Sequence, residues 1–346
     1  MAGERGGRSV KRQAITLAEI AEHGNLVLAA WKAARGKRTR PSVARFLADF
    51  ERQIARLAES IVHEQAPLGR SSSFSLYDPQ QRTIHAACFA DRVLQHAILN
   101  LAEPRFERML VANAYACRPG KGVHAAVTAV QGGLRARPWF AQVDVDAYFP
   151  SIRHERLLAL LARRFKGDGF FRLLQRILAC GATGGPGVGL PIGSLCSQHF
   201  ANAFLDSADR LLLAHRACGH LVRYMDHFFW ACDSRDAAEE SVGALAEHLQ
   251  RERGLRLTPK ICIGRSAQGT QFCGFRVRQG IVLASRRKLA RFRAAMQRLA
   301  AADAAGLVSE SELQRSADSA LSTLYGCETR AFRRRLLSAS GGFALS

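Results

Sequence analysis

The order of apolar segments between residues 140 and 263 most restricts the folds open to this chain. A strand-like run at 140–145 is followed by helical periodicity, and the alternation at 219–233 predicts a hairpin. Another helical pattern around Leu245 precedes a predicted strand at 255–263. Strand, helix, paired strands, helix and strand is the split βαβ order of a ferredoxin-like sheet.

The flanking segments add helices and two further hairpins. Residues 14–65 show the 3–4 spacing of apolar residues that predicts helices, and a longer helix is expected at 90–110. The segments 74–84 and 271–283 each predict a hairpin. We therefore expect an α+β chain.

Composition favours a polyanionic partner. The 346 residues carry a formal net charge of +21, although a basic coding bias, with Arg exceeding Lys, is an alternative cause. The nine cysteines include no C-x-x-C pair, and their odd number argues against a complete disulfide framework, so we expect a reduced, cytoplasmic setting. Neither a signal peptide nor an apolar run of membrane-spanning length is found, so no membrane partner is expected.

Two aspartates set among strand-forming residues carry the predicted chemistry. Asp144 lies in Gln-Val-Asp-Val-Asp-Ala-Tyr-Phe-Pro-Ser-Ile, and Asp226 lies in Arg-Tyr-Met-Asp-His-Phe-Phe-Trp. The loop Gly-Leu-Pro-Ile-Gly-Ser-Leu-Cys-Ser-Gln at 189–198 separates them. Nucleotidyl transfer uses two divalent cations, and two Asp side chains on adjacent strands can bridge such a pair. A lone D-x-D or Y-x-D motif is a weak signal because both are common, but the three elements in this order and at these intervals are a strong signal together.

These motifs resemble those of the reverse transcriptases, and within them the bacterial type found in diversity-generating retroelements. The resemblance covers roughly residues 20–340. The residues that carry it are Tyr115 to His124, Asp144 to Ile152, Gly189 to Gln198 with Ala201 and Asn202, Tyr224 to Asp226, and Phe272 to Phe275.

The resemblance implies a right-hand polymerase with fingers, a ferredoxin-like palm and a helical thumb. Its expected boundaries are a helical N-terminal extension at 1–66, fingers at 67–120 and 153–193, a palm at 121–152 and 194–283, and a thumb at 284–346.

The resemblance also implies roles around the triphosphate. Asp144 and Asp226 match the catalytic, metal-binding aspartates, with the Val145 carbonyl completing one coordination sphere. Phe149 matches the steric gate that rejects a 2′-hydroxyl. Arg82 resembles the fingers arginine that binds the triphosphate, since its guanidinium is a planar bidentate donor. A surface arginine in a hairpin is the alternative.

Further nucleotide contacts are implied at four positions. Ile192 stands where most reverse transcriptases have Gln, and the loss of an amide there predicts low fidelity. Gly193 and Gln198 are expected beside the nucleotide. Lys260 resembles a palm lysine that could act as general acid toward pyrophosphate, although a solvated lysine is nearly as good an interpretation.

Contacts to primer and template are implied in three regions, each with a structural alternative. Phe272 to Phe275 resembles the primer grip, but two aromatic residues on a hairpin equally suit a core. The basic residues are equally what a solvated surface carries. The expected primer and template residues are Arg118, Lys121, Phe272, Gly274, Phe275, Arg286, Arg287 and Lys288.

His227 departs from the family pattern, which has a second Asp after Asp226. The imidazole could ligate a cation, favouring Mn²⁺ over the two expected Mg²⁺ ions, or it could sit beside the metal site. The site could also have lost catalysis. His227 therefore belongs to the predicted catalytic set with its role open.

Two functions follow from these expectations. The first is an RNA-directed DNA polymerase that copies a structured RNA template from a primer, using dNTPs and forming an RNA–DNA hybrid, with a small basic accessory protein as a family expectation. The second is a reverse-transcriptase-derived RNA-binding subunit with reduced or no polymerase activity, for example in phage defence.

Overall fold

The computed structural model describes residues 11–66, 68, 71–77, 81–180, 184–329 and 332, and the side chains of 71–77 and 81–86 lie outside this description. The chain forms two compact units. Unit 1 comprises Met1–Ala112, Val145–Arg210 and Leu245–Thr258, and unit 2 comprises Asn113–Asp144, Leu211–Ala244 and Pro259–Ser346. The predicted fingers, palm and thumb boundaries stay predictions.

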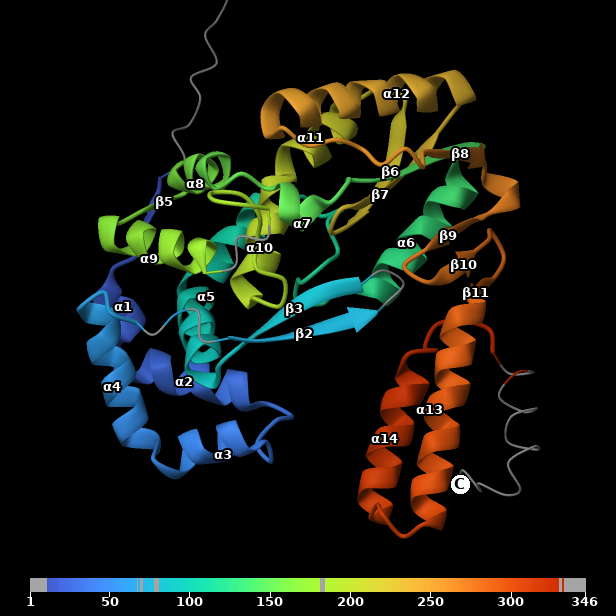
Figure 1. The fold of residues 1–346 in the computed structure, drawn as a ribbon. Coiled ribbons are helices and arrows are strands. Elements are labelled where there is room, and N and C mark those ends of the chain that lie inside the picture. The colour runs from blue at the N-terminus through green and yellow to red at the C-terminus, as the bar shows by residue number, and fades with distance from the viewer. Residues whose placement is uncertain are drawn as a thin grey trace, which may run out of the picture. The chain divides into compact units, whose positions relative to one another are not determined.

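Unit 2 contains a four-stranded antiparallel sheet with the order β6-β7-β4-β8. Its strands are β4 (Trp139–Asp144), β6 (Cys218–Tyr224), β7 (His227–Cys232) and β8 (Cys262–Arg265). Figure 1 labels three of these strands, β6, β7 and β8. The predicted ferredoxin-like order is confirmed. The last strand starts later than the predicted residue 255, because Pro259 cannot donate to a strand ladder and Leu257 forms only an isolated bridge with Val145.

Helix α6 (Val123–Ala136) covers this sheet through a core that includes Val130, Leu134, Phe140 and Phe229. The helix approaches the sheet closely at Gly133, where an added Cβ would lie 2.8 Å from Cε1 of Phe229. At the neighbouring Gly132 an added Cβ would meet no atom within 4 Å. Two adjacent glycines of one helix therefore occupy opposite environments.

Alanine substitution should separate these two glycines. Gly133→Ala is expected to destabilise the chain by about 1–3 kcal/mol, because overpacking against the Phe229 ring exceeds the gain in helix propensity. Gly132→Ala should stabilise it by about 0.5–1 kcal/mol. Urea unfolding of the two variants measures the difference, and equal midpoints would contradict the close packing of α6 on the sheet.

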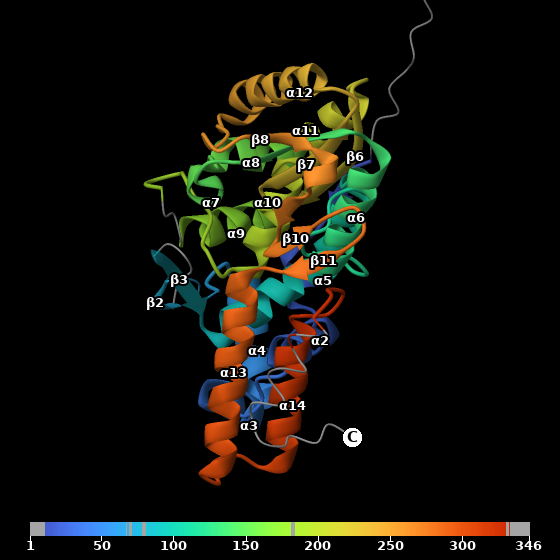
Figure 2. The same ribbon diagram turned by 90° about the vertical axis from the view of Figure 1, so that its right-hand side faces the viewer.

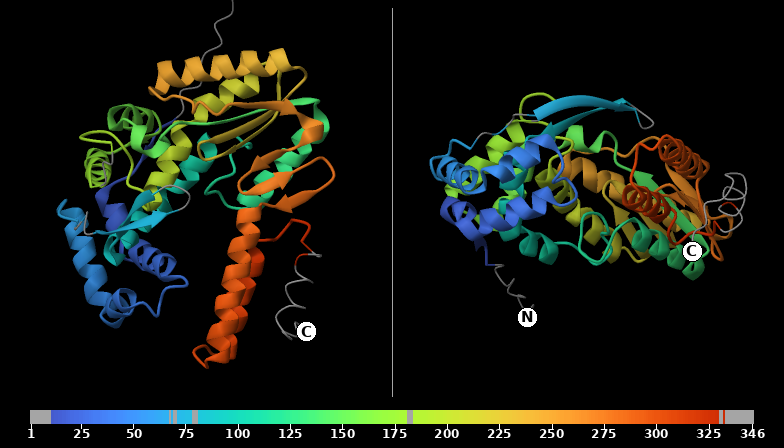
Figure 3. Two further views of the ribbon diagram at one scale, coloured as in Figure 1. Left: turned by 45° about the vertical axis from the view of Figure 1, so that its right-hand side comes forward. Right: turned by 90° about the horizontal axis from the view of Figure 1, so that it is seen from below.

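The remainder of unit 2 is a small sheet followed by two helices. The strands β9 (Thr270–Phe272), β10 (Phe275–Val277) and β11 (Val282–Ala284) pair in the order β11-β10-β9, so the predicted hairpin has a third strand. Helices α13 (Arg286–Ala304) and α14 (Glu310–Ser322) then pack side by side, as Figures 2 and 3 show. Ser285 and Ser309 cap their N-termini.

Unit 1 begins with the predicted helices and hairpin. The helices are α1 (Leu17–Ala21), α2 (His23–Ala34), α3 (Pro41–Ala48), α4 (Phe50–Val62) and α5 (Phe89–Met109). Strands β2 (Ser71–Tyr77) and β3 (Gln81–Ala87) pair antiparallel, which confirms the predicted hairpin and places Arg82 opposite Leu76. The chain is thus α+β, as expected.

The rest of unit 1 consists mainly of short helices. They are α7 (Tyr148–Ser151), α8 (His154–Ala162), α9 (Asp168–Ala179), α10 (Leu195–Phe204) and the π-helix η1 (Leu249–Arg253). Strands β1 (Gln13–Ala14) and β5 (Phe165–Lys166) form a parallel pair. Helices α11 (Asp206–Ala214) and α12 (Arg235–His248) each run from one unit into the other, and the 3-10 helix η2 (Ser266–Gln268) belongs to unit 2.

Candidate active site

The strand register of unit 2 places the predicted catalytic residues together. Asp144, the last residue of β4, is the cross-strand partner of His227, the first residue of β7. Directly opposed residues of an antiparallel pair project on the same face. Asp226 lies in the turn between β6 and β7, immediately before His227. One end of the sheet therefore carries both aspartates and the imidazole.

The thiol of Cys273 lies within the electrostatic influence of both carboxylates. Burial raises the pKa of Cys273 to about 12, Lys288 opposes that shift, and the charges of both Asp144 and Asp226 add to it. Electrostatic influence of this kind falls off with distance, so both carboxylates lie near this one thiol. Sequence reasoning missed Cys273, because a cysteine between two aromatic residues gives no signal of its own.

Asp144 is a partly desolvated carboxylate. Burial raises its pKa above the usual range, and the ammonium of Lys260 acts in the opposite direction. Removing water from a carboxylate disfavours its charged form, which a nearby cation restores. Lys260 is exposed. The predicted palm lysine thus acts electrostatically on the predicted metal ligand.

The imidazole of His227 is packed against an aromatic side chain. It stacks on Phe272 with ring centroids 4.3 Å apart and an interplanar angle of 28°. Burial lowers the pKa of His227 to about 4, although Asp226 acts to raise it, so the imidazole is neutral at pH 7. Its Nε2 is buried and has no hydrogen-bond partner in the described part of the chain. Of the interpretations open from the sequence, this arrangement favours an imidazole beside the metal site.

The burial of His227 predicts acid sensitivity. The unfolded chain takes up the His227 proton as the pH falls below 6.5, whereas the folded chain does so only near pH 4, so stability is lost between these values. His227→Phe keeps a ring on Phe272 and cannot titrate, so it should remove about 3 kcal/mol of that loss. Urea unfolding from pH 7 to pH 4 measures this difference. Parallel stability curves for the two chains would contradict the buried, neutral imidazole.

Arg223 supports the turn that carries Asp226. Its side chain is fully buried in β6, and Nη1 donates to the carbonyl of Met225 at 3.0 Å. Met225 has a left-handed φ of 56°. The guanidinium also lies 5.8 Å from the Phe228 ring centroid. Sequence reasoning missed this residue, and the available signal was an arginine inside an apolar strand, two residues from the turn.

The predicted primer-grip residues belong to the core of unit 2. Phe272 and Phe275 are buried and oppose each other in register across a two-residue turn. Both turn residues have left-handed φ, 47° at Cys273 and 78° at Gly274. At Gly274 this conformation suits glycine. The structural alternative for the two rings therefore holds, and a role in primer contact stays a prediction.

The basic residues of α13 that are predicted to contact primer or template differ in solvent exposure. Arg286 and Arg287 are exposed in the first turn of α13. Lys288 instead turns inward, with Nζ 3.1 Å from the Thr323 carbonyl and 3.7 Å from the Phe275 ring centroid. Burial lowers the pKa of Lys288. Its ammonium is therefore engaged within unit 2.

Arg118 and Lys121 fall in the compact turn before α6. Arg118 donates through Nη1 to the Ala114 carbonyl at 2.9 Å. The Lys121 ammonium lies 4.6 Å from the Tyr115 ring centroid. Both predicted residues are thus positioned by the turn itself.

Unit 1 brings together two of the predicted nucleotide-binding segments. The Phe149 carbonyl accepts from the Leu190 amide at 2.9 Å, so α7 adjoins the start of the 189–198 loop. Phe149 and Ile192 are partly buried, whereas Gly193 is exposed with φ 104°.

The end of the same loop begins α10. Ser194 caps this helix, and Gln95 of α5 accepts from the Leu195 amide at 2.7 Å. Gln198 lies in the first turns of α10, partly buried. Arg82 belongs to β3, but its side chain lies outside the described residues. Its predicted triphosphate contact stays a prediction.

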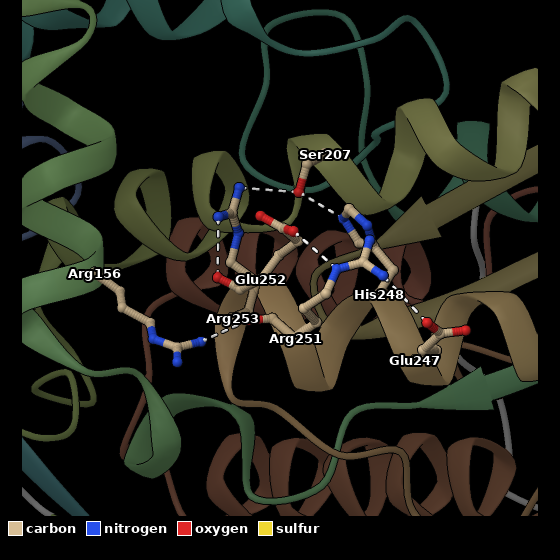
Figure 4. Close-up of polar contacts among 7 residues, drawn as sticks. All are labelled: Arg156, Ser207, Glu247, His248, Arg251, Glu252 and Arg253. Atoms are coloured by element: carbon tan, nitrogen blue, oxygen red, sulfur yellow. Dashed lines mark hydrogen bonds and ion pairs between the residues drawn. The ribbon is translucent and has the colours of Figure 1, made fainter.

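Val145 is held by the segment that follows the π-helix. It forms an isolated bridge with Leu257, and the Asp146 amide donates to the Arg256 carbonyl at 2.8 Å. The π-helix is anchored by Arg253, which donates to Ser207 Oγ (Figure 4). Arg253 also donates to the Phe204 carbonyl. This network explains how the backbone at the predicted metal ligand is positioned within unit 1.

The two carboxylates at the end of the unit 2 sheet are suitable ligands for a divalent metal ion. Among the described residues no group of three or more His, Cys, Asp or Glu suits a metal ion. Mg²⁺, however, is usually bound through one or two carboxylates together with substrate phosphates and water. Asp144 and Asp226 supply two carboxylates, and the desolvation of Asp144 is the condition that a cation relieves.

No helix in the described part of the chain is long and apolar enough to cross a membrane.

Two known proteins are similar in sequence to parts of this chain. An uncharacterized 91 kDa protein in the cob intron of Schizosaccharomyces pombe is 28% identical over 127 residues, covering 35% of this chain and 16% of that protein. The group II intron-encoded protein LtrA of Lactococcus lactis is 22% identical over 171 residues, covering 47% of this chain and 28% of LtrA. The chain thus spans less than a third of the length of these relatives.

A solved structure and a protein family also match parts of this chain. A solved apo telomerase from Candida tropicalis aligns with a TM-score of 0.49 and 9% identity, covering 78% of this chain and 59% of that one. The family described as reverse transcriptase (RNA-dependent DNA polymerase) matches residues 78–277, which include Asp144, Asp226 and the 189–198 loop. More than half of the chain lies in this match, and the chain therefore belongs to the reverse transcriptase family.

Proposed function

We propose that this chain is an RNA-directed DNA polymerase that copies a structured RNA template into cDNA by two-metal nucleotidyl transfer. The observation that carries the proposal is the strand register, which opposes Asp144 to His227 and so brings Asp226, the preceding residue, to the same end of the sheet. Family membership supports polymerase activity over a purely RNA-binding role.

The roles of the side chains follow from this arrangement. Asp144 and Asp226 would hold two divalent ions, with Mg²⁺ as the expected metal and Mn²⁺ as an alternative. When bound, the ions supply activation of the primer 3′-hydroxyl and neutralisation of the triphosphate charge. Lys260, which already acts on Asp144, is suited to protonate the leaving pyrophosphate. Phe149 would exclude a 2′-hydroxyl, and Val145 would present its carbonyl.

The partners proposed with this activity are a template RNA, a primer, their RNA–DNA hybrid and dNTPs, in the cytoplasm. A small basic accessory protein is proposed on the resemblance to diversity-generating retroelements. Intron-encoded relatives support a retroelement origin.

Low fidelity is proposed from Ile192. This partly buried residue offers no hydrogen bond to a nucleotide, so a wrong base would leave no polar group unpaired. Ile192→Gln should lower misincorporation opposite template adenine by roughly 10-fold. Equal misincorporation by the two chains, measured by sequencing their cDNA, would remove the support for the diversity-generating subtype.

Primer extension tests the activity itself. We expect the natural chain to extend a DNA primer on an RNA template with Mg²⁺ or Mn²⁺. His227→Asp restores the family carboxylate and serves as the comparison. If only His227→Asp extends the primer, the natural chain is an RNA-binding subunit and the proposed function is wrong.

A further inference from the structure

A second group of basic residues lies in the N-terminal helices of unit 1. It consists of Lys32 on α2, Lys37 and Arg40 in the turn before α3, and Arg92 and His96 on α5, and is called the basic cluster below. Its first three residues precede the span that matches the reverse transcriptase family. The carboxylate site, by contrast, belongs to unit 2.

Neutral groups position the cations of the basic cluster. The Arg92 guanidinium donates to the Ala33 carbonyl at the end of α2, and its central carbon lies 5.5 Å from the Phe89 ring centroid. Lys32 Nζ donates to Asn100 Oδ1 at 2.6 Å. Helices α2 and α5 therefore hold these cations without supplying negative charge.

The cations of the basic cluster repel one another. Burial lowers the pKa of Lys37, and Arg92 and Arg40 lower it further. Burial also lowers the pKa of His96 to about 4, with Lys32, Arg92 and Lys37 contributing. Within the described residues, Lys32, Lys37, Arg40 and Arg92 form no ion pair with a carboxylate. Such a concentration of like charge is relieved by a bound anion.

An exposed aromatic ring adjoins the basic cluster. Trp31 precedes Lys32 and is 44% exposed. The Arg38 guanidinium carbon lies 4.9 Å from its ring centroid, and Phe50 packs at 5.8 Å. An exposed indole that packs against neighbouring side chains, with cations beside it, suits the binding of single-stranded nucleic acid. A base can stack on the ring while the cations contact phosphates.

We propose that the basic cluster and Trp31 form a second nucleic-acid site, which binds single-stranded RNA through its phosphates and one stacked base. The choice of RNA as ligand rests on the proposed function, but binding at this site needs neither divalent metal nor polymerisation. This contact would retain the RNA through residues outside the carboxylate site.

The test is RNA binding by the full chain in EDTA without dNTPs, measured by fluorescence anisotropy of a labelled single-stranded RNA over a range of salt concentrations. The double variant Lys37→Ala/Arg40→Ala should bind roughly 10-fold more weakly. The slope of log affinity against log salt should fall by about 1.4, because each lost phosphate contact to a single strand contributes about 0.7. Trp31→Ala should weaken binding roughly 10-fold with the slope unchanged.

The matched control is Arg52→Ala/Arg56→Ala, which removes the same charge from exposed positions on α4. Equal losses for this control and for the cluster variant would overturn the site in favour of general charge attraction. Duplex RNA binding as tightly as single strands, with no effect of Trp31→Ala, would overturn the stacked base. Competition by polyglutamate as effective as by RNA would point to an acidic protein instead and overturn the proposal.

Two further measurements separate the possible failures. Thermal unfolding checks folding, and the cluster variant should be at least as stable as the natural chain because repulsion is relieved. Primer extension on a short template is measured separately with metal. Loss of RNA binding by the cluster variants supports the second site even if the natural chain extends no primer, whereas extension without a cluster effect on binding overturns the second site alone.

Discussion

Asp144→Asn is expected to lower primer extension by at least about 10³-fold while making the folded chain more stable at neutral pH. The carboxylate holds divalent metal in the proposed reaction, and losing several kcal/mol of charge stabilisation corresponds to that factor. Stability should change in the opposite direction because burial raises the pKa of Asp144. A carboxyl whose folded pKa is raised loses stability as the pH rises through that pKa, and Asn removes this loss.

Primer extension and urea unfolding at pH 5 and pH 7.5 measure both effects of Asp144→Asn. The control is Asp303→Asn, an exposed aspartate at the end of α13, which should change neither property. Full activity of the Asp144→Asn variant would contradict the metal role. A variant less stable than the natural chain at pH 7.5 would contradict the desolvated carboxylate.

Arg223→Met is expected to destabilise the chain by about 2–4 kcal/mol and to lower the rate of primer extension by about 100-fold. The stability loss arises because the charge-assisted hydrogen bond from the fully buried Arg223 to the Met225 carbonyl disappears. The activity loss arises because the turn that carries Asp226 is no longer fixed, and small misplacements of a catalytic group cost about this factor.

Arg223 is a positioning residue, so kcat should fall while the KM for dNTP stays the same, and the Mg²⁺ concentration at half-maximal rate should rise. Arg223→Lys keeps a cation and should restore part of the activity. Arg276→Met, which replaces an exposed arginine on β10, serves as the control and should change stability by less than about 0.5 kcal/mol. An unchanged metal requirement in Arg223→Met would reduce Arg223 to a purely structural role.

The α+β ferredoxin-like sheet could be predicted from the order of its strands and helices in the sequence, whereas the right-hand class followed from the resemblance to reverse transcriptases. Asp144 and Asp226 could be predicted because an acidic residue at the end of an apolar strand stands out. The start of β8 was misplaced because its limits depend on Pro259 and on a pairing partner, not on local hydrophobicity.

The surroundings of the site could not be predicted in the same way. The neutral, packed state of His227 depends on Phe272, which a distant segment brings onto its ring. The inward position of Lys288 depends on Thr323, at the C-terminal end of α14. Single residues show their type but not their neighbours, so the sequence did not reveal that the Lys288 ammonium contacts Thr323 and Phe275.

The proposed catalysis depends on the alignment of β4 with β7, because Asp144 pairs with His227 at the end of these strands. A slip of β4 against β7 by one residue would turn Asp144 to the opposite side of the sheet. Such a slip would leave helix content nearly unchanged, and circular dichroism would miss it. Loss of the proposed turnover would therefore report a misaligned sheet that circular dichroism does not reveal.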